Sequence, residues 1–248
     1  MATLTMAYQI VLCKYCNSSE VVRYGTQSGR PRFRCKECGR IFKTDYVYRA
    51  YEPGVKDQIA DIAMNGGGIR DTARILGIGK NTVISALKKS AAEVVAVNPY
   101  MGSREIAVEI RHLFDSPMDV QVDEQWSYVG NKKNQRWLWY AIDAVTGCVL
   151  SFVFGRRQDA VCEQLISNLK AFNIRTYYTD DWGSYSALIP KDKHVIGKQH
   201  TQKIENKNLL FRTRIKRLTR KTICFSKLEA LHDTVIGLFI NRYCFQTV

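Results

Sequence analysis

Four of the eight cysteines stand in two C-x-x-C pairs that are separated by eighteen residues: Cys13 with Cys16, and Cys35 with Cys38. A C-x-x-C turn brings two thiolates to one tetrahedral ion, and a second turn closes the coordination shell without leaving a position for catalysis. This spacing predicts a structural zinc site. The segment between the pairs suits a small hairpin, so we predict a zinc ribbon over residues 1–50 that needs its metal to fold.

Two disulfides are the alternative interpretation of these pairs, and a cytosolic location disfavours them. The other four cysteines are scattered through apolar surroundings, and we expect them to be buried thiols. They are Cys148, Cys162, Cys224 and Cys244.

Three acidic residues of the second half, Asp123, Asp180 and Glu205, carry the hard oxygen ligands that magnesium and manganese prefer. A cluster of such carboxylates is able to hold two ions about 3.5–4 Å apart, which is an arrangement suited to phosphodiester chemistry. Each residue also has an ordinary interpretation: a surface charge at a strand end, a helix cap at Asp180 or Asp181, or a salt bridge. Residue type alone leaves both interpretations open.

The elements around these acids decide whether they meet. Apolar and polar residues alternate from Met118 to Asp123, which predicts a strand that presents Asp123 near its end. Asp180 directly follows another predicted strand, and Glu205 lies on a basic helix that begins near residue 201. The full predicted order is strands at 136–143 and 148–155, a helix at 158–172, a strand at 174–179, an apolar run at 194–196 and the basic helix.

This order predicts an α/β fold, a ribonuclease H-like mixed sheet covered by helices, over residues 117–248. In such a fold, the strand ends that carry Asp123 and Asp180 lie close to the helix that carries Glu205.

Residues 51–92 have the pattern of three short helices separated by glycine turns. The third helix begins at Lys80, and its Val83 and Leu87 are able to face the other two. We predict a helix-turn-helix domain whose last helix enters the major groove of DNA, although a protein-binding bundle has the same pattern. A change of composition marks residues 93–116 as a linker. The candidates for DNA contact on the third helix are Lys80, Asn81, Thr82, Ser85, Lys88 and Lys89.

The chain of 248 residues has a formal net charge of +14 and a pI near 9.5. Because each Lys or Arg placed near a phosphate releases condensed counterions, this charge favours a nucleic-acid partner over a merely solvated surface. Double-stranded DNA is therefore the predicted partner. No apolar run approaches the length of a membrane helix, so we expect a cytoplasmic, nucleoid-associated protein of a bacterial or archaeal cell.

Several short segments resemble the transposases of the insertion sequence 1 family. They include Val-Asp-Glu-Gln-Trp at 122–126, Thr-Asp-Asp-Trp at 179–182 and Thr-Gln-Lys-Ile-Glu at 201–205, and flanking segments extend the resemblance over nearly the whole chain. The resemblance implies a DNA transposase with the zinc ribbon and helix-turn-helix reading terminal inverted repeats. It also implies that Asp123, Asp180 and Glu205 hold Mg²⁺ or Mn²⁺ for 3′ end cleavage and strand transfer into target DNA.

The resemblance further implies that Arg212, on the same helical face as Glu205, contacts DNA near the cut. Arg214 and Lys216 belong to a basic stretch with too few acids for salt bridges, so we predict phosphate contacts for them too. One departure is Asp181, where the family pattern has glycine. Because neighbouring residues of a strand point to opposite faces, we do not expect Glu124 to be a metal ligand together with Asp123.

Two other functions fit the same residues. One is a transcription regulator whose second half is not catalytic, and the other is a nuclease of the same fold that cuts DNA without joining it. Because joining involves two DNA ends, the interpretation as a transposase also predicts a homo-oligomer, at least a dimer.

Overall fold

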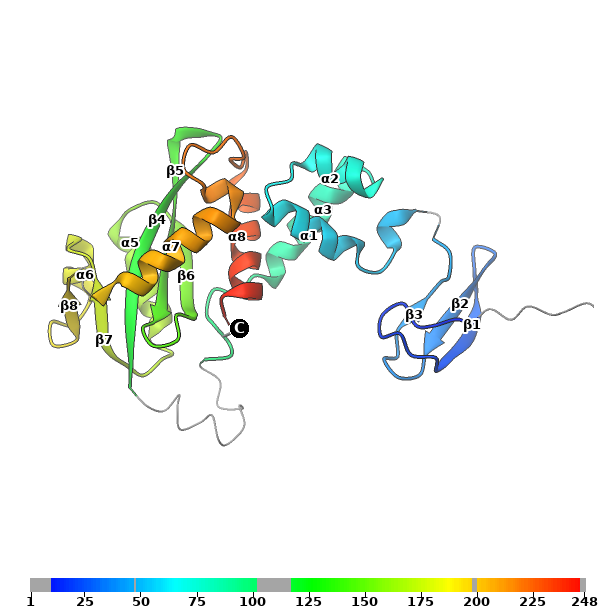
Figure 1. Ribbon diagram of the computed structural model, residues 1–248, viewed down its shortest axis with the longest axis horizontal. Coiled ribbons are helices and arrows are strands. Elements are labelled where there is room, and N and C mark those ends of the chain that lie inside the picture. The colour runs from blue at the N-terminus through cyan, green and yellow to red at the C-terminus, as the bar shows by residue number, and fades with distance from the viewer. Residues whose placement is uncertain (1–9, 47, 102–116, 198–199, 246–248) are drawn as a thin grey trace, which may run out of the picture.

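The computed structural model describes residues 10–46, 48–101, 117–197 and 200–245, and Figure 1 shows its elements along the chain. Most of the predicted linker, 102–116, lies outside these residues. The N-terminal part is a small antiparallel sheet in the order β1-β2-β3. Its strands are Val21–Gln27, Arg30–Cys35 and Ile41–Phe42.

Three helices follow, as the glycine pattern predicts. They are α1 (Val55–Met64), α2 (Ile69–Leu76) and α3 (Lys80–Ser90), with short 3₁₀ turns η1 (Arg49–Tyr51) and η2 (Ala91–Glu93) at either side. Val83 and Leu87 of α3 are buried, as the helical spacing predicts. Gly66 ends α1 with φ +85°, and a Cβ there would lie 2.7 Å from Cβ of Lys216. Only glycine therefore fits this turn.

The second half holds a five-stranded mixed sheet in the order β6-β5-β4-β7-β8, which confirms the predicted sheet. β5 runs antiparallel to its two neighbours β4 and β6, and β7 and β8 run parallel to β4. The strands are β4 (Met118–Val129), β5 (Asn131–Asp143), β6 (Val149–Gly155), β7 (Ile174–Thr179) and β8 (His194–Ile196).

Helices cover both faces of this sheet. α5 (Asp159–Leu169) and α6 (Gly183–Leu188) pack on the face that carries Val120, Val122 and Trp139. α7 (Gln202–Arg214), η4 (Lys216–Leu218) and α8 (Glu229–Tyr243) pack on the other face, with Tyr140. Among the described residues, no helix is long and apolar enough to cross a membrane.

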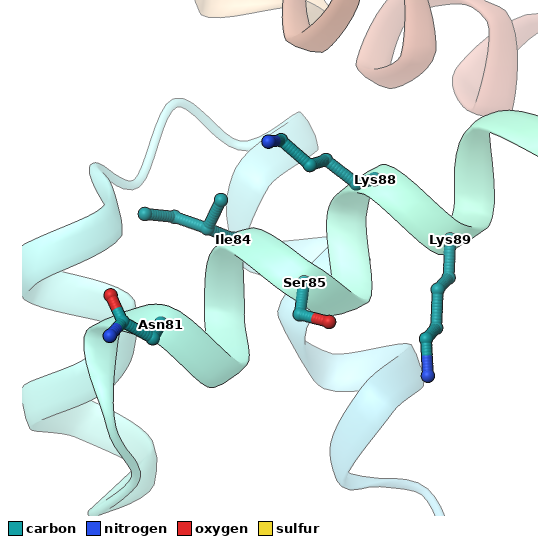
Figure 2. Close-up of a pocket in the computed structure, with 5 residues that line it drawn as sticks. All are labelled: Asn81, Ile84, Ser85, Lys88 and Lys89. Carbon is teal, nitrogen blue, oxygen red and sulfur yellow. The ribbon is translucent and has the colours of Figure 1, made fainter.

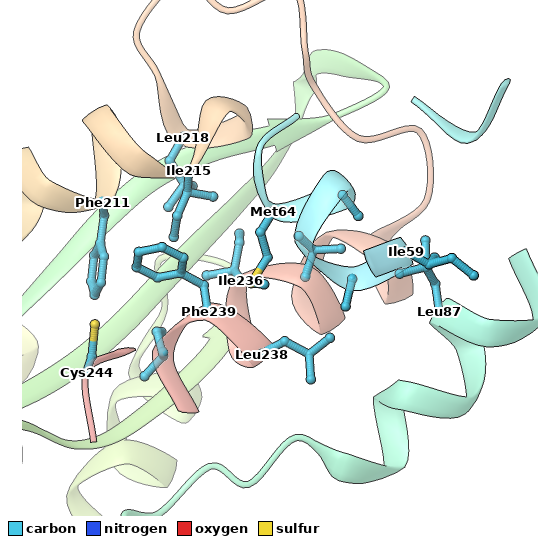
Figure 3. Close-up of a cluster of buried hydrophobic side chains, with 14 of the residues drawn as sticks. Ile59, Met64, Leu87, Phe211, Ile215, Leu218, Ile236, Leu238, Phe239 and Cys244 are labelled. Carbon is cyan, nitrogen blue, oxygen red and sulfur yellow. The ribbon is translucent and has the colours of Figure 1, made fainter. Parts of the chain in front are cut away.

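α8 lies between the sheet and the three N-terminal helices (Figure 1). One core runs through all of them, from Ile59 and Leu87 past Leu238 to Phe211 (Figure 3). Polar contacts reinforce this packing, because Arg217 donates to the carbonyl of Ala63 at 2.9 Å. The helical module is thus packed against the sheet module.

Two sequence-based expectations differ from the structure. β4 does not end near Asp123 but continues to Val129, because its antiparallel pairing with β5 extends along the whole hairpin. The parallel neighbour β7, however, pairs with β4 only as far as Gln121. Asp123 therefore lies just beyond the point where β4 loses one neighbour. Of the scattered cysteines, Cys224 is exposed rather than buried.

Candidate functional site

Asp123 and Asp180 come together at this point of the sheet. Asp180 directly follows β7, and β4 carries Asp123 past the end of that strand. Oxygens of Asp123, Asp180 and Glu124 all lie within 4.8 Å of one another. This is a cluster of three carboxylates, two of which sequence analysis had singled out.

Asp123 is held in place by α7. The side-chain amide of Asn208 donates to Oδ2 of Asp123 at 2.5 Å, and the backbone N–H of Glu124 donates to Oδ1 at 2.8 Å. Tyr140 in turn donates to Oδ1 of Asn208 at 2.9 Å, which fixes the orientation of the amide. The carboxylate thus has a defined position before any ligand binds.

A second contact sets the position of α7 along β4. The side-chain oxygen of Gln121 accepts the backbone N–H of Ile204 at 2.8 Å, in the first turn of the helix. Ile204 is fully buried, so the neighbouring Glu205 is exposed at the rim of the site. Glu205 is not part of the three-carboxylate cluster, yet its charge acts on Asp123.

Burial raises the pKa of Asp123, and the charges of Asp180 and Glu205 raise it further. The hydrogen bonds from Glu124 and Asn208 oppose this change. Packing several carboxylates into one partly buried site without a cation is unfavourable because their charges repel. A bound cation would relieve this repulsion.

Glu124 is the residue that sequence analysis left aside. Successive side chains of β4 point to opposite faces, yet oxygens of Asp123 and Glu124 both lie within 4.8 Å of an oxygen of Asp180. The Glu124 side chain is 3% exposed and accepts bonds from Arg157 at 2.6 Å and from the Tyr185 hydroxyl at 2.7 Å. No signal in the sequence marked it, because Arg157 and Tyr185 come from distant elements.

Aromatic rings surround the arginine that pairs with Glu124. The guanidinium of Arg157 lies 4.9 Å from the ring centre of Trp182 and 5.3 Å from that of Trp137. Such cation–π contacts hold a planar guanidinium in one orientation. Trp182 and Trp137 therefore hold the arginine that pairs with Glu124, whereas Trp139 is fully buried.

We expect stability to depend on pH through Glu124. Burial, with the charges of Asp180 and Asp123, raises the pKa of Glu124 from 4.5 to about 7. Between these values the folded protein keeps a proton that the unfolded chain has lost, so the free energy of unfolding falls as pH rises through this window. Without divalent metal, wild type should lose about 3 kcal/mol more than Glu124→Gln between pH 4.5 and 7.5.

Tryptophan fluorescence during chemical denaturation measures this difference, because all four tryptophans lie in the second half of the chain. Equal pH slopes for the two proteins would contradict the assigned environment of Glu124.

Asn208→Ala should weaken metal binding, because it removes the group that orients Asp123. Loss of such an outer hydrogen bond typically lowers metal affinity by about 10–100-fold. Titration with Mn²⁺ measures the change directly. The matched control is Asn206→Ala, an exposed asparagine on the same helix. An unchanged affinity in Asn208→Ala would rule out this positioning role.

The four paired cysteines also meet. Their sulfurs all lie within 4.8 Å of one another, with Cys13 and Cys38 at 3.6 Å and Cys16 and Cys35 at 3.5 Å. Sulfurs that share one zinc at about 2.3 Å lie about 3.8 Å apart, so these distances suit a tetrahedral ion rather than disulfides. Burial raises the pKa of Cys13, but hydrogen bonds from the backbone of Tyr15 and Cys16 and with the thiols of Cys16 and Cys38 together lower this pKa to about 6.

Figure 2 shows the outer face of α3, where Asn81, Ser85, Lys88 and Lys89 surround a shallow hollow with Ile84. Lys80 is also exposed. Thr82 differs from the others, because its hydroxyl bonds that of Tyr48 at 2.9 Å. The predicted contact residues thus form one polar surface, with Thr82 partly occupied in holding α3.

The other predicted basic contacts lie at the end of α7. Arg212 is partly buried, and Arg214 and Lys216 are exposed. Arg212 faces β4, where it lines a pocket with Trp126, whereas Arg214 lines a separate pocket against α1. The three residues therefore do not form a single patch.

Comparison with known proteins gives two family matches. The family model described as IS1 transposase matches residues 118–246, just over half of the chain, and the one described as InsA C-terminal domain matches residues 46–91. The insertion element iso-IS1n protein InsB of Shigella dysenteriae is 54% identical over 125 residues, which is 50% of this chain and 95% of that protein. The IS1 protein InsB of Shigella flexneri is 46% identical over 121 residues, 49% of this chain and 92% of that protein.

Proposed function

We propose a reaction for this chain from the premise that it belongs to the IS1 transposase family and carries both an InsA-type helix-turn-helix part and a DDE transposase part. The chain binds the terminal inverted repeats of its insertion sequence, cuts the 3′ ends and joins them to target DNA. The observation that carries this proposal is the meeting of Asp123 and Asp180 where β7 ends beside β4.

The residues present fit a divalent metal. Their donor atoms are carboxylate oxygens, which suit Mg²⁺ or Mn²⁺, and a cation would reduce the repulsion between Asp123 and its acidic neighbours. Asp123 and Asp180 would hold the metal, with Glu205 as the third ligand implied by the family pattern. When bound, the metal supplies activation of the attacking oxygen and stabilisation of charge on the departing 3′ oxygen.

The residues of the chain hold and shape this centre. Asn208 fixes Asp123, and Gln121 fixes the turn of α7 that carries Glu205. Arg157 and Tyr185 hold Glu124 at the opposite side, where it adds a further negative charge. Water as the attacker frees a 3′ hydroxyl, and this hydroxyl then attacks target DNA in the same site.

The module assignments belong to the same proposal. The second half, 117–248, is a ribonuclease H-like catalytic domain, supported by its strand order and directions. Residues 1–50 are a zinc ribbon, supported by the spacing of its four sulfurs. Residues 51–92 are the DNA-binding domain and 93–116 a linker. Because two ends are joined, the working form is at least a dimer.

Helix α3 reads the inverted repeat through its outer face. In this proposal Asn81 meets a base edge, and Lys88 and Lys89 meet phosphates. The support is that all three side chains line the same hollow on α3 (Figure 2). Arg212 contacts DNA near the cut, and Arg214 and Lys216 contact phosphates elsewhere on the DNA.

Replacing Asn81 or Lys88 should separate these two kinds of contact. Asn81→Ala is expected to lower affinity by about 1–3 kcal/mol for the inverted repeat alone, since a base contact carries sequence information. Lys88→Ala should weaken binding to all duplexes and reduce the salt slope by about 1. Fluorescence anisotropy at several salt concentrations measures both effects. Equal losses on specific and random duplexes in Asn81→Ala would contradict base readout.

The direct test of function combines the protein, Mg²⁺, labelled element ends and a supercoiled plasmid. The proposal expects cleaved ends and their insertion into the plasmid. Cleavage without insertion would support the nuclease alternative, and binding without cleavage would support the regulator.

A further inference from the structure

A pocket of about 240 Å³ lies between β4 and the loop that follows α7. Trp126 and Tyr128 form one wall, and Arg212, Leu218, Arg220 and Lys221 form the other. The volume is smaller than the roughly 300–1,000 Å³ of sites for drug-sized ligands, so it suits a single planar ring system. We call this the Trp126 pocket.

The pocket exists because β4 loses its parallel neighbour. β7 pairs with β4 only to Gln121, so the edge of β4 beyond this residue is open to the loop after α7. The Tyr128 hydroxyl donates to the carbonyl of Thr222 at 3.2 Å, and Val129 pairs with Ser226. These contacts hold the far wall against the strand.

The loop that follows α7 is also stabilised by two hydrogen bonds of its own. The Thr219 hydroxyl donates to the carbonyl of Arg212 at 2.7 Å, and the Thr222 hydroxyl donates to that of Lys216 at 2.8 Å. The pocket is therefore formed before any ligand arrives, which reduces the ordering cost of binding.

The walls combine an aromatic ring with positive charge. Trp126 is 39% exposed, which is unusual for so large an apolar side chain, and its ring lies 5.6 Å from that of Tyr128. Three of the residues that line the pocket, Arg212, Arg220 and Lys221, carry a positive charge in addition to the buried Arg217, and none carries a negative charge. Aromatic faces beside arginines are what single-stranded nucleotides bind.

The pocket lies near the carboxylates, because β4 and α7 contribute residues to both. Trp126 is three residues beyond Asp123 on β4, or about 10 Å along the strand. Arg212 is seven residues beyond Glu205 on α7, which is also about 10 Å along the helix. Successive nucleotides of one strand are about 3.4 Å apart, so the pocket lies about three nucleotides from the carboxylates.

Resting on the proposed function, we propose that the Trp126 pocket takes one nucleobase turned out of the element's DNA within about three nucleotides of the reacting phosphodiester. The base stacks on Trp126, and Arg220 and Lys221 contact the adjoining phosphates. Because the base leaves the duplex, the strand beside it becomes able to bend into the carboxylate site.

A binding cycle tests this directly, with the full chain, no added magnesium, and duplexes that carry the element's end. An abasic site is placed in turn at each position within three nucleotides of the cut, in either strand. On the intact duplex, Trp126→Ala should weaken binding by about tenfold. At one abasic position this effect should fall below about twofold, because the stacked ring is already missing.

Trp126→Phe keeps an aromatic face and should recover most of the lost affinity on the intact duplex. The matched control is Tyr243→Ala, a half-exposed aromatic residue that lines a different pocket. Its effect should be the same on every duplex.

The inference is overturned if Trp126→Ala weakens binding equally on intact and on all abasic duplexes, or does not weaken it at all. Normal end cleavage and joining alongside such a result would leave the proposed function standing. Failure of the wild type to bind the ends would overturn both.

Discussion

Asp123→Ala and Asp180→Ala should each abolish end cleavage and joining, with a loss of at least about a thousandfold, or about 4 kcal/mol of transition-state stabilisation. The reason is that each carboxylate supplies an oxygen to the centre that carries charge in the reaction. The protein, labelled ends and a plasmid are incubated with Mg²⁺, and the rates of cleavage and insertion are compared.

DNA binding separates this effect from unfolding. Both variants should bind the element's ends as wild type does, because α3 lies in another part of the chain. Mn²⁺ titration should show weakened metal binding in both. Retained joining in either variant would refute its assignment.

Asp181→Ala is the matched control, because Asp181 is the exposed neighbour of Asp180 and is not in the carboxylate cluster. It should retain joining within about threefold, as surface substitutions usually do. If Asp181→Ala is inactive and Asp180→Ala is active, Asp181 and not Asp180 is the metal ligand.

The joining activities of Glu205→Gln and Glu124→Gln show which of the two carboxylates is the third metal ligand. The family pattern implies Glu205, whereas the cluster of close oxygens contains Glu124. We expect Glu205→Gln to lose joining as completely as Asp123→Ala, and Glu124→Gln to keep measurable activity. The reverse order would make Glu124 the ligand.

Removal of zinc should unfold residues 10–46 while the rest of the chain keeps its structure. This part has a core of only a few residues, chiefly Cys13, Cys35 and Phe42, which is too little apolar surface for independent folding. In zinc-finger peptides, structural zinc contributes about 10–16 kcal/mol of binding energy to folding.

Cys35→Ser tests the same point without a chelator, and Cys224→Ser is the matched control because Cys224 is an exposed free thiol. Metal analysis should find zinc in wild type and in Cys224→Ser but not in Cys35→Ser. Limited proteolysis should then cleave the N-terminal sheet of Cys35→Ser first. A zinc-free wild type with a protected N-terminal sheet would contradict the ribbon.

Some features of this protein were determined by the sequence alone, because they depend on residues close together in the chain. The two C-x-x-C pairs need only short turns to bring their thiolates together. The three helices follow from apolar spacing and glycine turns, and the predicted strand at 174–179 places Asp180 directly after its end. Local periodicity is enough for such elements because their hydrogen bonds and faces are local.

The tertiary structure alone decided which side chains share a site. β4 does not end at Asp123; the site lies there because β7 stops pairing at Gln121, and that stop depends on long-range packing. The same stop lets Glu124 approach Asp180 and opens the edge that forms the Trp126 pocket. A pattern of period two predicts the face of each residue but not where a neighbouring strand ends. The approach of Glu124 to Asp180 and the Trp126 pocket were therefore not predictable from the sequence.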